Sequence, residues 1–303
     1  MKYLITGGCG FIGSNLVDKL TSLGHDVLVI DNLSTGKKEN CNSLATYIFK
    51  DYQKTLKDSL FTISDPLCEN IDVIFHLAAM PRIQPSFDNP LYTMSNNAHG
   101  TAILCEFARK KNSKVVYAGS SSFYGGVYLN PYSFSKWVGE EICKMYSQIY
   151  EVPTSIARFF NVFGPRHLRT GPYSTVVGVF EKQFSDGLPL TITGDGDQRR
   201  DFTHVDDICN GLIAMSEGTY YGEIFNLGTA KNYSINELAS MYDGAKTEFI
   251  AARPGEARET LADISYTRSA LNWSPLEQNS LKDYIAQFVE SLNPERELTI
   301  DNL

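Results

Sequence analysis

The segment that most constrains the fold is Gly7-Gly-Cys-Gly-Phe-Ile-Gly13, because of what lies on either side of it. The preceding run, Lys2 to Thr6, is short and apolar, which predicts a buried strand. Apolar residues at helical spacing follow from Phe11 to Leu23 and stop at Gly24, which predicts a helix. Glycines between a strand and a helix allow a tight turn and a close approach of the backbone to a phosphate at the helix N-terminus. The segment therefore predicts a dinucleotide-binding loop.

A carboxylate at the end of the next strand predicts which dinucleotide binds. Val27 to Ile30 is the second apolar run, and Asp31 follows it, 18 residues after Gly13. A carboxylate there accepts hydrogen bonds from a ribose 2′-hydroxyl and repels a 2′-phosphate, so NAD is favoured over NADP. Lys37 and Lys38 are too far from the strand end to reverse this preference.

Strands and helices alternate along the first half of the chain. Further buried strands are predicted at Val73 to Phe75, Val115 to Tyr117 and Thr154 to Arg158, and helices at Met94 to Lys111 and Tyr132 to Tyr150. Such alternation is typical of βαβ units. We therefore expect an α/β fold with a doubly wound parallel (Rossmann) sheet.

The pattern changes after about residue 164, where Pro and Gly become frequent. Short strands, Leu190 to Ile192 and Phe249 to Ile250, mix there with short helices, which predicts a smaller, interleaved α/β substrate-binding domain. Val205 to Met215 and Ile224 to Leu227 are expected to return to the first domain. The predicted NAD-binding domain is thus 1–164 plus about 200–228, and the nucleotide-sugar-binding domain about 165–199 plus 229–303.

Composition excludes several classes of function. The formal charge of −8 argues against a nucleic-acid binder, which needs a basic face. Six cysteines form no CxxC pair, so we expect no metal site, and their scatter fits a reducing cytoplasm. No run of 18 apolar residues exists, and a strand beginning at Lys2 leaves no room for a signal peptide, so we expect neither membrane nor secretion.

Tyr132 and Lys136 are a candidate catalytic pair. They are four residues apart at the start of a predicted helix, so they share one face. A free tyrosine has a pKa of about 10, and we expect the lysine ammonium and a bound nicotinamide ring to lower it. The phenolate would then be a general base for a sugar hydroxyl. Gly119-Ser-Ser-Ser122 follows a predicted strand and supplies hydroxyls at the same edge of the sheet.

Taken together, these segments resemble the extended short-chain dehydrogenase/reductase family, and within it the nucleotide-sugar 4-epimerases. The resemblance extends from Thr6 to about Ala286. The matching segments are Thr6-Gly-Gly-Cys-Gly-Phe-Ile-Gly13, Asp31-Asn-Leu-Ser-Thr-Gly36, His76-Leu-Ala-Ala79, Asn97-Ala-His-Gly-Thr101, Ser120-Ser-Ser-Phe-Tyr-Gly125, Tyr132-Ser-Phe-Ser-Lys136, Arg158-Phe-Phe-Asn-Val-Phe-Gly-Pro165 and Gly194-Asp-Gly-Asp-Gln-Arg-Arg-Asp-Phe202.

The resemblance implies a role for each matching residue. The catalytic residues would be Ser120, Tyr132 and Lys136. The cofactor would be bound by Gly7, Gly10, Phe11, Ile12, Gly13, Asp31, Asn32, Asp51, Leu77, Ala78, Ala79, Asn97, Tyr132 and Lys136. The UDP-sugar would be bound by Arg82, Ser121, Ser122, Asn161, Thr191, Arg200, Arg253, Glu256 and Thr260, with Arg200 and Arg253 on the diphosphate.

The resemblance also implies the reaction. Family dehydratases have Asp-Glu where this chain has Ser121 and Ser122, and family decarboxylases have Glu at the second position, so C4 epimerisation through a transient 4-keto sugar is favoured. The segments Arg169 to Ser174 and His76 to Ser86 resemble the branch that acts on UDP-N-acetylhexosamines. Thr260 stands where a bulky Tyr restricts the pocket to unsubstituted hexoses, so an N-acetyl group has room.

Several alternatives stay open at this point. Arg82 is unusual for that branch and can pair with a carboxylate, so UDP-glucuronate remains an alternative, as does UDP-glucose. The segment from Tyr124 to Tyr132 is shorter than in the family, and the region from Asp51 to Ile71 is trimmed, so the sugar specificity can differ. A 4-keto-sugar reductase that releases its cofactor, or a non-catalytic NAD sensor, would have the same fold.

A homodimer is expected as well. In the family, helices beginning near Tyr92 and Tyr132 pair across a two-fold axis. The outward face of the second helix is apolar here, at Val138, Ile142, Met145 and Ile149.

Overall fold

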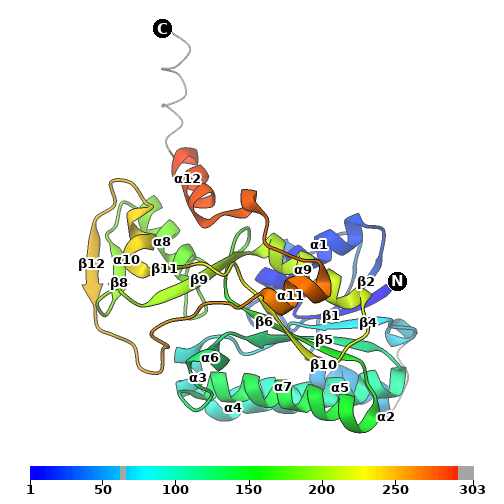
Figure 1. Ribbon diagram of the computed structural model, residues 1–303. Coiled ribbons are helices and arrows are strands. Elements are labelled where there is room, and N and C mark those ends of the chain that lie inside the picture. The colour runs from blue at the N-terminus through cyan, green and yellow to red at the C-terminus, as the bar shows by residue number, and fades with distance from the viewer. Residues whose placement is uncertain (62–65, 293–303) are drawn as a thin grey trace, which may run out of the picture.

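A seven-stranded sheet forms the centre of the larger part of the molecule. The computed structural model describes residues 1–61 and 66–292 (Figure 1). The strand order is β10-β6-β5-β4-β1-β2-β3, and every pairing is parallel. The strands are β1 (Lys2–Thr6), β2 (Asp26–Ile30), β3 (Thr46–Ile48), β4 (Val73–His76), β5 (Lys114–Ser120), β6 (Thr154–Phe159) and β10 (Tyr221–Leu227). All carboxyl ends therefore meet at one edge.

Helices cover both faces of this sheet (Figure 1). One face carries α1 (Phe11–Ser22), α9 (Val205–Glu217) and α11 (Ser265–Leu271), and the other carries α2 (Tyr52–Phe61), α5 (Gly100–Lys111) and α7 (Pro131–Tyr150). Each face has its own buried apolar cluster, because strands covered on both sides are apolar throughout. The predicted doubly wound α/β fold is confirmed. None of the helices in the described ranges is long and apolar enough to cross a bilayer.

One predicted helix differs from the expectation near its start. The segment from Met94 to Lys111 is helical, but α4 (Pro90–Met94) and α5 are joined by a π-helical turn, Ser95–His99. A π turn carries one extra residue per turn and is frequent at functional sites. Here it places the Asn97 side chain in the protein interior.

A smaller unit lies beside the carboxyl ends of the strands (Figure 1). It contains a two-stranded sheet, a three-stranded sheet and three helices around a separate apolar cluster. Its elements are β7 (Asn161–Phe163), α8 (Val176–Ser185), β8 (Leu190–Thr193), β9 (Arg199–His204), β11 (Asn232–Ser234), α10 (Ile235–Ser240), β12 (Thr247–Ile250) and α12 (Leu281–Ser291).

The segment from Ala262 to Trp273 departs from the sequence-based division of the chain. That division assigns it to the smaller domain, yet Ala262, Ile264 and Trp273 are buried in the cluster beneath α1 and α9. The Trp273 indole also donates a hydrogen bond to the carbonyl of Asp207 on α9, at 3.0 Å. These residues therefore pack with the larger unit. The end of the predicted second domain, 293–303, lies outside the described residues.

Candidate active site

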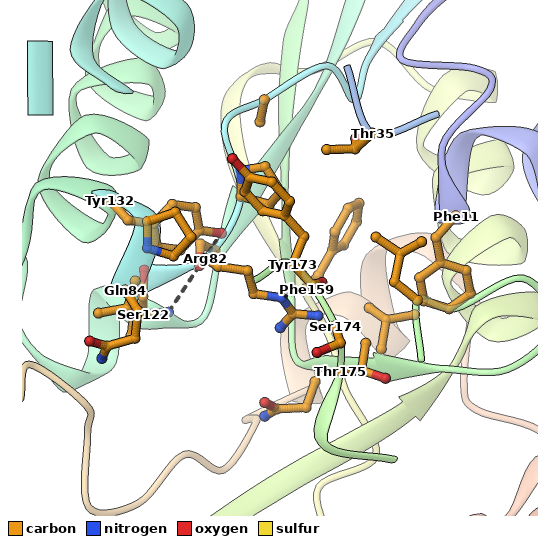
Figure 2. A pocket seen from close by; sticks show the side chains of 18 of the residues that line it. Phe11, Thr35, Arg82, Gln84, Ser122, Tyr132, Phe159, Tyr173, Ser174 and Thr175 are labelled. Atoms are coloured by element: carbon orange, nitrogen blue, oxygen red, sulfur yellow. Dashed lines mark hydrogen bonds between the residues drawn. The ribbon is translucent and has the colours of Figure 1, made fainter. Parts of the chain in front are cut away.

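A cavity of about 750 Å³ opens at the carboxyl ends of the strands, between the two units (Figure 2). Gly7, Asp31, Ser120 and Tyr132 line it from the larger unit, and Arg200 from the smaller one. In open parallel sheets ligands bind in this position, outside the carboxyl ends of the strands. The volume is within the range of small-molecule sites.

The glycine loop has the geometry of a phosphate cradle. Gly7 has a φ of +78°, and a Cβ on it would stand 2.8 Å from the backbone nitrogen of Ala78. A Cβ on Gly13 would clash with the carbonyl oxygen of Gly7. Helix α1 begins after Gly10, which has no side chain to cap the first N–H groups. These groups and the helix dipole are therefore available to an anion. The loop fits the pyrophosphate of NAD.

Asp31 fixes this loop as well as lining the cavity. Its Oδ2 accepts a hydrogen bond from the Cys9 backbone N–H at 2.9 Å, and its Oδ1 accepts from the Leu33 N–H at 2.7 Å. The carboxylate thus joins the end of β2 to the glycine loop. The other cofactor-site residues at the cavity wall are Gly7, Gly10, Phe11, Ile12, Gly13, Asn32, Leu77, Ala78 and Ala79.

Asp51 and Asn97 are the two predicted cofactor residues that do not line the cavity. Asp51 is exposed, and its Oδ1 accepts from the Lys54 N–H at the start of α2. Asn97 is buried; its amide accepts from the Met80 N–H at 2.7 Å and donates to the Met80 carbonyl and the Ser135 hydroxyl, both at 3.0 Å. Asn97 therefore fixes the loop after β4, and its contact with the cofactor stays a prediction.

Ser120 and Tyr132 meet inside the cavity. Ser120 is the last residue of β5 and Tyr132 lies in the first turn of α7, which Asn130 caps by accepting from the Ser133 N–H. The Tyr132 hydroxyl donates to Ser120 Oγ at 3.4 Å, and the Ser122 N–H donates to the same oxygen at 3.2 Å. Both acceptor positions of Ser120 are thus used, so its own proton is free for a ligand oxygen.

The pKa of Tyr132 differs from the expectation. Burial raises it, and the Ser120 hydrogen bond and the Arg82 guanidinium offset this in part. The buried Lys136 ammonium lies 4.4 Å from the centre of the Tyr117 ring, and burial lowers the pKa of Lys136 to about 8. The predicted lowering of the Tyr132 pKa is therefore wrong for the protein alone. The cation that acts on Tyr132 is Arg82.

The nine predicted substrate-site residues all line the cavity: Arg82, Ser121, Ser122, Asn161, Thr191, Arg200, Arg253, Glu256 and Thr260. The hydroxyls of Ser122 and Thr260 are buried and have no hydrogen-bond partner among the described residues. Arg200 stands 3.7 Å from Glu256, while Arg253 is exposed.

Some residues that line the cavity were not predicted from the sequence. Tyr173, Ser174 and Thr175 lie in the loop before α8 and close the cavity from the smaller unit (Figure 2). Tyr173 and Ser174 belong to the motif Arg169 to Ser174, and Thr175 follows it, but nothing in the local pattern tells which side chains face the cavity. Lys50 and Thr35 also line the cavity, after β3 and β2.

Comparison with known proteins agrees with this geometry. Residues 3–228 match the model of the NAD dependent epimerase/dehydratase family. The chain is 35% identical to a putative UDP-glucose 4-epimerase of Methanocaldococcus jannaschii, over 94% of this chain and 96% of that protein.

Solved structures are similar over the whole chain. A UDP-N-acetylglucosamine 4-epimerase from Methanobrevibacter ruminantium, in complex with UDP-N-acetylmuramic acid, is 30% identical, with a TM-score of 0.83 over 98% of this chain and 99% of that one. A UDP-glucuronic acid 4-epimerase from Bacillus cereus, in complex with UDP-glucuronic acid and NAD, is 31% identical, with a TM-score of 0.83 over 97% and 100%.

The protein therefore belongs to the NAD dependent epimerase/dehydratase family. It is an NAD-dependent enzyme of the nucleotide-sugar epimerase type.

Proposed function

We propose that this enzyme inverts C4 of a UDP-N-acetylhexosamine, interconverting UDP-GlcNAc and UDP-GalNAc. The observation that carries the proposal is the Tyr132–Ser120 pair at the edge of the sheet where the glycine loop also opens. NAD bound to that loop supplies a hydride acceptor and donor for C4. The protein's own groups then have to handle a single proton, at O4.

Tyr132 is placed to handle that proton. As the phenolate, which the positive ring of a bound nicotinamide would favour, Tyr132 takes the O4 proton as a general base and returns it as a general acid, a role worth about 10²- to 10⁴-fold in rate. The free Ser120 proton donates to the same sugar oxygen and holds it in place. Ser121 and Ser122 are neither acids nor bases at neutral pH, so elimination or decarboxylation has no assistance here.

The pocket supports an N-acetylated sugar. Thr260 lines the cavity with a short side chain, and its buried Oγ1 has no partner. A buried hydroxyl without a partner costs about 1–3 kcal/mol, so a polar substituent of the ligand is its natural partner. Ser122 Oγ offers a second such group.

Proton NMR of the enzyme with NAD and UDP-GlcNAc tests the proposal. We expect the anomeric signal of UDP-GalNAc to appear and to be absent with Tyr132→Phe. Thr260→Tyr should slow the N-acetylated pair more than UDP-glucose, and Thr260→Ser should preserve both. Stoichiometric consumption of nicotinamide, without inversion, would instead establish a net oxidoreductase.

We also propose a homodimer formed through α4 and α7. Met145 and Ile149 on α7 and Leu91 and Tyr92 on α4 are exposed apolar side chains. Helices α4 and α7 contact each other, so these residues belong to neighbouring surfaces. Light scattering at micromolar concentration should give twice the mass of 33.8 kDa, and Ile149→Lys should lower it. A monomeric wild type would contradict the dimer.

A further inference from the structure

Arg82 places a cation at the sugar end of the cavity. Arg82 follows the end of β4 in the chain, and its side chain lies in the cavity beside Tyr132 and Tyr173 (Figure 2). Arg82 immediately precedes the short helix α3 (Ile83–Asp88), which is attached to α7 because the Tyr132 N–H donates to Ser86 Oγ at 3.1 Å. Arg82 is therefore held near the residue that handles O4.

The guanidinium group of Arg82 is largely unpartnered. Its Nε donates to the Tyr173 carbonyl at 3.2 Å, while neither terminal nitrogen has a hydrogen-bond or ion-pair partner within residues 1–61 and 66–292. Burial lowers the pKa of Arg82, with Tyr132 and Glu256 acting in the opposite direction. An arginine nevertheless stays charged at neutral pH. A half-buried cation with two free nitrogens is a ready donor to an anion.

The charges around Arg82 leave this cation uncompensated. Among the described residues, Glu256 is the carboxylate that acts on the Arg82 charge, and it also pairs with Arg200 at 3.7 Å. One carboxylate between two guanidinium groups leaves a net positive charge. Arg200 and Arg253 are the candidate partners of the diphosphate, so Arg82 is not needed to neutralise it.

The backbone at Arg82 supports a dedicated role. Its φ of +79° lies in a region that non-glycine residues rarely adopt. Such a conformation costs about 1–3 kcal/mol and persists where the surroundings enforce it, often at ligand sites. A glycine would avoid this cost but would remove the cation.

We propose that Arg82 is a specificity residue that binds a carboxylate on the sugar of the UDP-sugar substrate. This rests on the proposed epimerase function and adds carboxylate-bearing sugars to the neutral UDP-N-acetylhexosamines as substrates of the same site. Planar guanidinium and carboxylate groups form paired, charge-assisted hydrogen bonds, which a neutral hydroxyl cannot match. The carboxylate can be carbon 6 of a uronic acid or part of an ether substituent on the ring, since either brings the same group to the cavity.

The experiment measures binding separately from turnover. Isothermal titration of the NAD-loaded enzyme uses UDP-glucuronate, UDP-N-acetylmuramate, UDP-GlcNAc, UDP-glucose and UDP. Epimerisation of each sugar is followed in parallel by NMR. The variants are Arg82→Met, which removes the charge at similar length, and Arg82→Lys, which keeps it; Arg268→Met, an exposed arginine on α11 outside the cavity, is the matched control. Thermal unfolding shows that each variant is folded.

Arg82→Met should weaken binding of at least one carboxylate sugar by about 10- to 100-fold, the range for a hydrogen bond to a charged group. Binding of UDP-GlcNAc, UDP-glucose and UDP should change by less than about threefold, because they lack that partner. Arg82→Lys should retain part of the preference, and Arg268→Met all of it. The identity of the affected sugar tells a uronate from an ether-linked acid.

Two results would overturn the proposal. If Arg82→Met weakens UDP itself as much as the acidic sugars, Arg82 binds the diphosphate. If it weakens none of them, Arg82 is structural. A different result would contradict the proposed function. If acidic sugars bind selectively through Arg82 but no sugar is inverted at C4, the carboxylate site stands and the epimerase reaction does not.

Discussion

The two ends of the cavity differ in how completely the protein satisfies its own polar groups. At the cofactor end, both oxygens of Asp31 accept backbone hydrogen bonds, and the glycine loop is fixed by the sheet. At the sugar end, the hydroxyls of Ser122 and Thr260 and the terminal nitrogens of Arg82 have no partner among the described residues. Buried polar groups are normally paired, so the open ones that line the cavity are candidate partners for a ligand.

This difference between the two ends of the cavity allows one fold to bind several different sugars. The end that binds the shared cofactor consists of backbone turns that tolerate little change. The end that selects the sugar consists of loop side chains, which can be replaced without altering the sheet. Substitutions at the two ends should therefore have different consequences for folding, cofactor binding and turnover.

The largest effect is expected from Tyr132→Phe at the sugar end. Loss of the phenolic proton carrier should lower kcat by about 10²- to 10⁴-fold. NAD content and melting temperature should stay close to wild type, because the ring and its packing remain. Rapid-quench NMR and absorbance of bound nicotinamide measure the two quantities. If Tyr132→Phe lost bound NAD together with kcat, substitutions at the sugar end would also disturb the cofactor end.

Gly13→Ala should affect the cofactor end instead. A Cβ there clashes with the Gly7 carbonyl, and backbone cannot move aside cheaply. Overpacking of this kind costs about 1–3 kcal/mol of stability. We expect a lower melting temperature and loss of retained NAD, both measured on the purified protein. Gly24→Ala is the control outside the cofactor loop: nothing lies within 4 Å of its Cβ, and the strain from its positive φ should lower stability without loss of retained NAD.

Asn97→Ala should give a smaller effect of the same kind. It removes two hydrogen bonds to Met80 in the loop after β4 and one to Ser135 on α7, and it leaves the Met80 N–H and carbonyl buried without these partners. An unpaired buried group costs about 1–3 kcal/mol, so denaturant unfolding should show a loss of that size. NAD affinity should fall less than in Gly13→Ala. A large loss of affinity with unchanged stability would restore the direct cofactor role predicted from the sequence.

The smallest effect is a pH dependence. Burial lowers the pKa of Lys136 to about 8, so its ammonium is present below that pH and is lost above it. If catalysis needs the cation, kcat should decline as pH rises through about 8. Lys136→Arg, which stays charged, should have lower activity but no such decline. A decline at the same pH in both enzymes would assign it to another group.

The features that the sequence predicts are those encoded locally. β1, α1 and β2 follow from apolar spacing and glycines, and β5 follows from the apolar run Val115 to Tyr117, although the strand extends to Ser120. The features it misses depend on contacts between distant segments. The π turn at Asn97, the position of Tyr173 over the cavity and the strained Arg82 backbone all arise from packing that no local pattern records. The raised pKa of Tyr132 in the protein without NAD is missed for the same reason, because burial is a property of the whole fold.

The return of residues 262–273 to the larger unit restricts how this protein can be divided. The chain enters the smaller unit at β7, leaves it for α9 and β10, enters it again at β11 and comes back with Trp273 before α12. A fragment ending at residue 228 would expose the hydrophobic surface that Trp273 covers on α9. The larger unit therefore cannot be excised, fused or exchanged by cutting the chain at a single point.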